Sequence, residues 1–152
     1  IAWKLRNHPR VRLLERTNIR YLTPEQIPEL ADIATIDLSF ISVRKVLKNI
    51  IQLLKLDGEL VILIKPQFEV GKGKVGKGGI VKDPQLHRKL LLELWQYFEG
   101  EGLRVKGLTF SPIKGVEGNI EFFFYLSKTD AEGKESARIK EVVEEAHESF
   151  KV

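Results

Sequence analysis

The stretch GELVILIKP, residues 58–66, gives the clearest indication of the fold. It holds an unbroken apolar run from Leu60 to Ile64, which is typical of a parallel strand buried on both faces of a sheet. Lys65 follows this run directly and so lies at the carboxyl end of the strand, where open α/β sheets bind their ligands. The lysine is therefore either a functional group or a long side chain that reaches the rim of the core.

Strands and helices alternate on either side of this run. Hydrophobic spacing predicts strands at residues 11–14, 32–37, 59–64, 103–110 and 119–126. Spacing and cap residues predict helices at residues 1–8, 42–55, 84–99 and 134–150, and a helical turn at 23–30. Gly58 is expected to end the second of these helices. This order indicates an α/β fold with a doubly wound, mostly parallel sheet, whose last two strands form an antiparallel hairpin at one edge.

The composition limits the class of protein. The 152 residues are 43% hydrophobic, carry a net charge of +4 and include no cysteine. This length suits one domain with a core, and without cysteine no disulfide or thiolate metal site can form. No apolar run approaches the ~20 residues of a membrane span, so no membrane partner is expected. With no signal peptide at the start of the chain, we expect a cytoplasmic protein.

Positive charge gathers in two segments. Residues 1–20 hold six Lys or Arg residues and one acid, and residues 65–82 hold five lysines and one acid. Two basic segments on one domain favour a polyanionic partner, nucleic acid first. An ordinary solvated surface fits the charge equally well.

The second basic segment contains GKGKVGKGG, residues 71–79, which matches two phosphate-binding patterns. Gly71, Gly73 and Gly76 fit G-x-G-x-x-G, and Gly71 to Lys77 fit G-x-x-x-x-G-K. A P-loop needs Ser or Thr after its lysine, where Gly78 stands, and a dinucleotide-binding turn follows its strand directly, which this one does not. We instead expect a mobile basic lid that positions an RNA backbone through Lys72, Lys74 and Lys77.

Polar residues gather where the predicted strands end. Asp37 and Lys65 follow strands at their carboxyl ends, and Glu121, two residues after Asn119, lies near the start of the final antiparallel strand at the same edge. We expect Asp37, Lys65 and Glu121 to converge on one cleft. Taken singly, Asp37 could cap the following helix and Glu121 could pair with a surface lysine. No metal is expected, because the histidines show no ligand spacing: His8, His87 and His147.

The start of the chain indicates that part of the fold precedes residue 1. The first helix has neither an N-cap nor a first turn of its own. Glu15 follows the strand at 11–14, and an acid that ends the second strand of a nucleotide-binding sheet typically bonds ribose hydroxyls, with a glycine-rich turn ~20 residues earlier. That turn would lie before Ile1, so we expect an N-terminally truncated sheet.

Four stretches carry a resemblance to a known family: AWKLRNHPRVRLLERTNIRYL, TIDLSFISVRKVL, ILIKPQFEVGKGKVGKGGIVKDP and SPIKGVEGNIEFFFYL. Over residues 1–127 the chain resembles the TlyA or hemolysin A-like family, a branch of the FtsJ/RrmJ-like S-adenosylmethionine-dependent methyltransferases. The resemblance implies an S4-type RNA-binding domain upstream and the C-terminal part of a Rossmann-like methyltransferase domain in residues 1–128. In residues 129–152 we expect an acidic amphipathic helix packed on the same domain.

The resemblance also implies roles for single residues. Such enzymes methylate ribose 2′-hydroxyls of ribosomal RNA with a Lys-Asp-Lys-Glu tetrad, whose last three members match Asp37, Lys65 and Glu121. The first lysine and the glycine-rich cofactor loop would lie upstream of the chain. Glu15 matches the ribose-binding acid of the cofactor site, to which Asp37 also belongs. Asn18 matches the position beside the adenine, where related enzymes carry Asp.

The resulting prediction is methyl transfer from S-adenosylmethionine to a ribose 2′-hydroxyl of ribosomal RNA. In-line positioning can supply much of the rate, with Lys65 as a base or as a charged orienting group. One alternative is a non-catalytic RNA-binding module, which the basic loop fits equally well. The other is a membrane-active, hemolysin-like protein, but no segment combines a Lys-rich face with a face of Trp, Phe and Leu, and the last helix is acidic.

Overall fold

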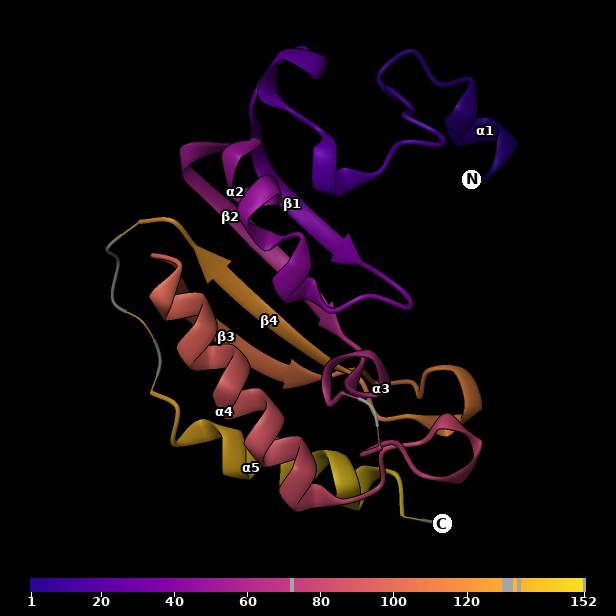
Figure 1. Ribbon diagram of the computed structural model, residues 1–152, viewed down its shortest axis with the longest axis vertical. Coiled ribbons are helices and arrows are strands. Elements are labelled where there is room, and N and C mark those ends of the chain that lie inside the picture. The colour runs from indigo at the N-terminus through magenta and orange to yellow at the C-terminus, as the bar shows by residue number, and fades with distance from the viewer. Residues whose placement is uncertain (72, 130–132, 134, 152) are drawn as a thin grey trace.

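A four-stranded sheet forms the centre of the computed structural model, which describes residues 1–71, 73–129, 133 and 135–151. The strand order is β1-β2-β4-β3, with β1 parallel to β2 and β4 antiparallel to both β2 and β3. Three of the four strands therefore run in one direction, and the hairpin of β3 and β4 closes one edge (Figure 1). This confirms the α/β class and the edge hairpin; β1 and β2 pair in parallel, and the other two pairings in the sheet are antiparallel. The strands are β1 (Ala31–Asp37), β2 (Leu54–Ile64), β3 (Arg104–Phe110) and β4 (Phe122–Ser127).

The longest described helix, α4, begins where the sequence predicts. Asp83 Oδ1 accepts a hydrogen bond from the N–H of Gln85 at 2.8 Å, and Pro84 takes the first helical position. Helices α4 and α5 contact each other, and both pack against β3 (Figure 1). The domain boundary at residue 128 stays a prediction. The helices are α1 (Trp3–Arg6), α2 (Leu47–Gln52), α3 (Pro66–Glu69), α4 (Pro84–Gly100) and α5 (Arg138–Ser149). The 3-10 turns are η1 (Ile19–Tyr21), η2 (Pro24–Gln26), η3 (Val43–Lys45), η4 (Lys77–Gly79) and η5 (Val116–Gly118).

The core lies between the sheet and the helices α2, α4 and α5. Phe124 of β4 is fully buried, and its ring packs edge-on against Trp95 and Phe98 of α4 at centroid distances of 6.0 and 5.1 Å. Each buried aromatic side chain contributes roughly 1.5–3 kcal/mol through burial. Helix α5 adds an apolar face of buried residues: Ile139, Val142, Val143 and Ala146. This packing fixes the sheet whose edge carries the polar residues.

The two faces of the sheet are covered differently. Leu60, Ile62 and Ile64 of β2 point into the core and are buried, whereas Val61 and Leu63 on the opposite face are only half-buried. The described helices thus cover one face. The expected burial of this strand on both faces holds for one face only.

The helix predicted at residues 42–55 ends earlier than expected, which is a correction. It divides into η3 and α2, and β2 already begins at Leu54. Gly58 therefore lies within β2 and does not end the helix. Leu54 is buried in the strand, as it would be on the predicted helix face, so its apolar character could not separate the two. The register between β1 and β2 shifts in this segment. A Cβ on Gly58 would lie 2.8 Å from that of Leu54, so a glycine fits this irregularity.

The strand predicted at residues 11–14 is absent, which is a second correction. Residues 1–30 contain α1, η1 and η2 but no strand. In Figure 1 this segment extends past β1, and the N-terminus lies apart from the sheet. A strand persists only where a neighbour satisfies its backbone hydrogen bonds, and residues 11–14 pair with none of the four described strands.

Candidate active site

The predicted acid–lysine group assembles at one edge of the sheet. Asp37 is the last residue of β1, Lys65 follows β2 directly, and Glu121 directly precedes β4. The Nζ of Lys65 lies 2.6 Å from Oδ1 of Asp37 and donates a hydrogen bond to Oγ of Ser39 at 3.2 Å. The side chain of Lys65 is 16% exposed and that of Asp37 68%, so the lysine is the more enclosed partner. Parallel pairing produces this contact, because it sets Asp37 opposite Leu63, two residues before the lysine.

Glu121 completes the group. It is 7% exposed and lines, together with Lys65, a cavity of about 380 Å³. Burial raises the pKa of Glu121, the positive charge of Lys65 lowers it, and the negative charge of Asp37 raises it further. The structure thus places Lys65 in contact with Asp37 and in one cavity with Glu121, while Asp37 itself lies outside the lining of that cavity. Their catalytic role stays a prediction.

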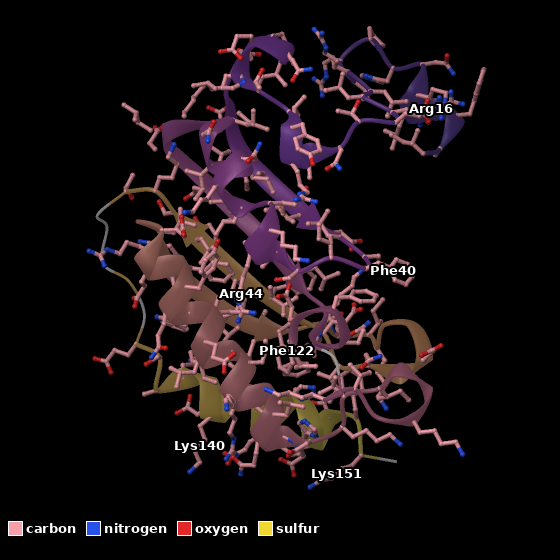
Figure 2. All side chains as sticks on the ribbon, viewed as in Figure 1. Arg16, Phe40, Arg44, Phe122, Lys140 and Lys151 are labelled. Atoms are coloured by element: carbon pink, nitrogen blue, oxygen red, sulfur yellow. The ribbon has the colours of Figure 1, made fainter. Side chains whose placement is uncertain are left out.

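Two phenylalanines line the same cavity, and the sequence reasoning missed them. The rings of Phe40 and Phe68 lie 5.0 Å apart, and Phe40 is 90% exposed at the sheet edge (Figure 2). Phe40 has a φ of 62°, in the left-handed region that is costly for a residue with a side chain. An exposed aromatic ring held in this way contributes little to folding and suits ligand contact. The available signal was an aromatic residue three positions after the predicted strand at 32–37.

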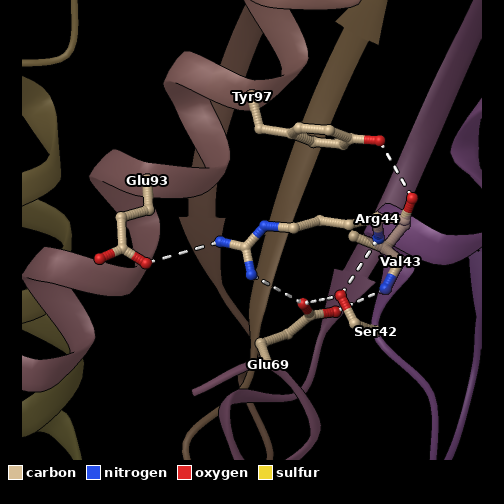
Figure 3. A network of polar contacts seen from close by, with 6 residues as sticks. All are labelled: Ser42, Val43, Arg44, Glu69, Glu93 and Tyr97. Atoms are coloured by element: carbon tan, nitrogen blue, oxygen red, sulfur yellow. Dashed lines mark hydrogen bonds and ion pairs between the residues drawn. The ribbon is translucent and has the colours of Figure 1, made fainter. Parts of the chain in front are cut away.

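A buried carboxylate fixes the segment that carries Phe68. Glu69, the last residue of α3, has a side chain only 4% exposed. It accepts hydrogen bonds from Oγ of Ser42 at 2.6 Å and from the N–H of Val43 at 2.7 Å (Figure 3). Burial raises the pKa of Glu69, while these donors and the nearby Arg44 guanidinium lower it. Glu69 therefore ties α3 to η3. The network also includes two residues of α4: Glu93 and Tyr97.

Asn119 holds the end of the basic loop. It is 1% exposed; its Oδ1 accepts a hydrogen bond from the N–H of Val81 at 3.0 Å, and its Nδ2 donates to the carbonyl of Gly79 at 3.0 Å. Both groups lie about 40 residues away in sequence. The loop therefore ends beside the segment that leads to Glu121.

Of the three lysines predicted to contact RNA, Lys74 and Lys77 are described and exposed, and Lys72 lies outside the described residues. The N-terminus of α4, which a P-loop would offer to phosphate, is already capped by Asp83. This agrees with the rejection of the P-loop pattern. That the loop acts as a mobile lid stays a prediction.

The residues expected to bind cofactor lie in two places. Asp37 stands at the rim of an apolar groove of about 330 Å³ along β1 and α2. Glu15 lies in the N-terminal segment, where its two carboxylate oxygens accept hydrogen bonds of 2.6 Å from Arg6, which lowers the pKa of Glu15. Asn18 Oδ1 accepts from the N–H of Arg20 at 3.1 Å and caps η1. Neither Glu15 nor Asn18 lines the cavity described above.

The described part of the chain, residues 1–71, 73–129, 133 and 135–151, holds no group of three or more His, Cys, Asp or Glu residues that could bind a metal ion. None of its helices has the length and apolar character needed to cross a membrane.

Comparison with known proteins defines the class. A family model described as FtsJ-like methyltransferase matches residues 1–128. The chain therefore belongs to the FtsJ-like methyltransferase family, and its fold is the Rossmann-like methyltransferase fold.

Three of the matching proteins each cover at least 90% of this chain. The chain is 45% identical to "Putative rRNA methyltransferase YqxC" of Bacillus subtilis, over 99% of the chain and 56% of that protein. It is 46% identical to "16S/23S rRNA (cytidine-2'-O)-methyltransferase TlyA" of Mycobacterium tuberculosis, over 90% of the chain and 53% of that protein. A solved structure, "Putative hemolysin from Streptococcus thermophilus", matches with a TM-score of 0.94 at 43% identity, over 99% of this chain and 55% of the other. The chain thus spans about half the length of the curated relatives it matches.

Proposed function

We propose that the protein transfers a methyl group from S-adenosylmethionine to a ribose 2′-hydroxyl of ribosomal RNA. One observation carries the proposal: in a member of a methyltransferase family, an enclosed lysine pairs with Asp37 and shares a cavity with Glu121. The names of the relatives, which specify rRNA methyltransferases, support the substrate class.

Lys65 acts in this proposal as a charged orienting group. An ammonium carries three N–H donors. One is directed at Asp37 and a second at Ser39, which leaves the third for an oxygen bound in the cavity. That donor fixes the position of the acceptor hydroxyl. As the hydroxyl proton leaves to water, the ammonium stabilises the negative charge that remains on the oxygen, which forms the new bond to the transferred methyl carbon. The carboxylates of Asp37 and Glu121 restrict where the ammonium can lie, so the third donor keeps one direction.

The cofactor would bind beside Asp37. The apolar groove suits a flat adenosyl group, and the carboxylate at its rim suits hydroxyl or ammonium substituents. Glu15 and Asn18 would contribute from the N-terminal segment, with Glu15 exchanging Arg6 for ribose hydroxyls. When bound, S-adenosylmethionine supplies an electrophilic methyl group on a positively charged sulfur.

The RNA would contact aromatic and basic residues around the cavity. Enzymes that act on one nucleotide often take its base out of the stack, and unstacked bases pack on phenylalanine rings. Phe40 and Phe68 offer such a surface at the cavity. The exposed Lys74 and Lys77 would bind neighbouring phosphates and set the position of the strand.

Labelled-methyl incorporation by the full-length protein tests this function. We expect label from S-adenosylmethionine to appear in ribosomal RNA, and digestion to nucleosides to yield a 2′-O-methylated product. A target oligonucleotide with 2′-deoxyribose at the modified position is the matched control and should accept no label. Label on a base would contradict the acceptor assignment. RNA binding without incorporation would favour the non-catalytic RNA-binding module.

A further inference from the structure

The turn before β4 leaves space for the Glu121 carboxyl group at Gly115. A Cβ on Gly115 would overlap Oε1 and Cδ of Glu121 and lie 3.1 Å from its Cγ. Side-chain atoms do not approach a Cβ this closely, so either Glu121 or the turn would have to move. The backbone of Gly115 is not in the left-handed region, which excludes conformational strain as the reason for a glycine here.

The turn itself is held on both sides, so Gly115 cannot easily withdraw. The N–H of Gly115 donates to the carbonyl of Asn119 at 2.9 Å, and the N–H of Gly118 donates to the carbonyl of Gly115 at 3.0 Å. The N–H of Ser111 donates to the carbonyl of Glu121 at 2.8 Å. The Asn119 side chain is also bonded to the backbone on either side of residue 80. A side chain at Gly115 would therefore displace Glu121 rather than the turn.

Displacement of Glu121 would change the position of the Lys65 ammonium. The two residues line one cavity, and the charge of Lys65 acts on the pKa of Glu121. If the carboxylate moves, the ammonium loses one of the two negative charges that restrict it and keeps its contacts with Asp37 and Ser39. A misplacement of about 1 Å in such a group costs on the order of 100-fold in rate, because reacting atoms must be aligned.

We propose that Gly115 is a positioning residue for methyl transfer: by carrying no side chain, it lets the Glu121 carboxylate occupy the place from which it orients Lys65. This rests on the proposed function. Gly115 touches neither cofactor nor RNA in this proposal and acts through Glu121 alone. The same turn thus has two uses, since Asn119 fixes the basic loop and Gly115 fixes the acid.

Gly115→Ala in the full-length protein tests the proposal. We expect kcat for RNA methylation to fall on the order of 10- to 100-fold, with KM for RNA nearly unchanged, because alignment and not binding is lost. Gly100→Ala is the matched control: Gly100 has an ordinary backbone conformation, and among the described residues no atom beyond its chain neighbours and its own helix backbone lies within 4 Å of its Cβ position. It should keep wild-type kcat. Wild-type kcat in Gly115→Ala would overturn the positioning role.

A second background separates positioning from simple misfolding. Gly115→Ala should lower Tm in the wild-type protein but not in a Glu121→Ala protein, where the overlapping carboxyl group is gone. An equal drop in Tm in both backgrounds would overturn the proposed contact. These outcomes differ from failure of the proposed function, in which the wild-type protein itself transfers no methyl group to RNA.

Discussion

Residues 1–30 are held by different interactions from the end of the sheet where β1 and β2 finish and β4 begins. In residues 1–30 only Leu22 is buried, and Trp3 and Tyr21 are 76% and 69% exposed. The Arg6–Glu15 pair there is exposed, and such pairs contribute little. At the sheet edge, the polar residues stand at the ends of strands whose alternate side chains fill the core. The residues proposed to orient the acceptor are thus fixed by packing, whereas two of the proposed cofactor contacts depend on a loosely packed segment.

The largest expected difference between the two regions is in stability. Phe124→Ala should lower the free energy of unfolding of the full-length protein by about 3–5 kcal/mol, because it opens a cavity against Trp95 and Phe98. Trp3→Ala should change it by less than about 0.5 kcal/mol, because that ring is mostly in water. Urea denaturation measures both. Similar values for the two variants would show that the N-terminal segment is packed as tightly as the core.

The two regions should also differ in how their stability depends on pH, because the core holds the buried His87 and the N-terminal segment holds the exposed His8. His87 is fully buried between α4 and α5, with its Nδ1 2.9 Å from Nε2 of His147. Burial, with a smaller contribution from His147 and partly offset by Asp83, lowers the pKa of His87 from 6.5 to about 4. His8, in the N-terminal segment, is exposed.

A lowered histidine pKa means that the folded state binds fewer protons than the unfolded state between pH 6.5 and 4. The contribution of His87 to stability is therefore complete above pH 6.5 and is lost as pH falls toward 4, by up to about 3 kcal/mol. Urea unfolding across this range should show the loss in the wild-type protein and in His8→Gln, and a flatter profile in His87→Gln. An unchanged profile in His87→Gln would place the titrating group elsewhere.

The basic loop should affect RNA binding without affecting cofactor binding. Replacing Lys74 and Lys77 together by Ala should reduce the slope of log K against log salt by up to roughly two units, if both contact phosphate. The exposed Lys140 on α5 provides a control that should leave the slope unchanged. RNA binding at several salt concentrations measures the effect. An unchanged slope in the double variant would remove the loop from the RNA interface.

The smallest expected effect concerns Arg6. Arg6→Ala frees both oxygens of Glu15 and should raise the pKa of that carboxyl toward its ordinary value, observable in an NMR titration. If Glu15 binds the ribose of the cofactor, calorimetry should show an affinity gain no larger than about fivefold, since exposed ion pairs are weak. A loss of affinity would instead make Arg6 part of the cofactor site.

The sequence predicts best the elements whose hydrophobic spacing or cap residues lie within the element itself. Strand ends can be read from apolar runs, and parallel pairing then brings Asp37 and Lys65 together, so this part of the site was predictable. The strand at 11–14 was wrong because a strand also needs a neighbour, which its own residues do not reveal. Phe40 and Gly115 were missed for a related reason: an exposed ring and an absent side chain acquire meaning only from the tertiary contacts around them.

In the proposed function, the enclosed Lys65 orients the acceptor oxygen. Single-turnover methylation of ribosomal RNA by the full-length Lys65→Ala protein tests it most directly, with Lys48→Ala, an exposed lysine on α2, as control. We predict that Lys65→Ala slows methyl transfer at least ~100-fold, the usual cost of removing one group that stabilises developing charge, with cofactor affinity nearly intact. Lys48→Ala should react at the wild-type rate. A Lys65→Ala protein that methylates RNA as fast as Lys48→Ala would show that Lys65 does not orient the acceptor oxygen.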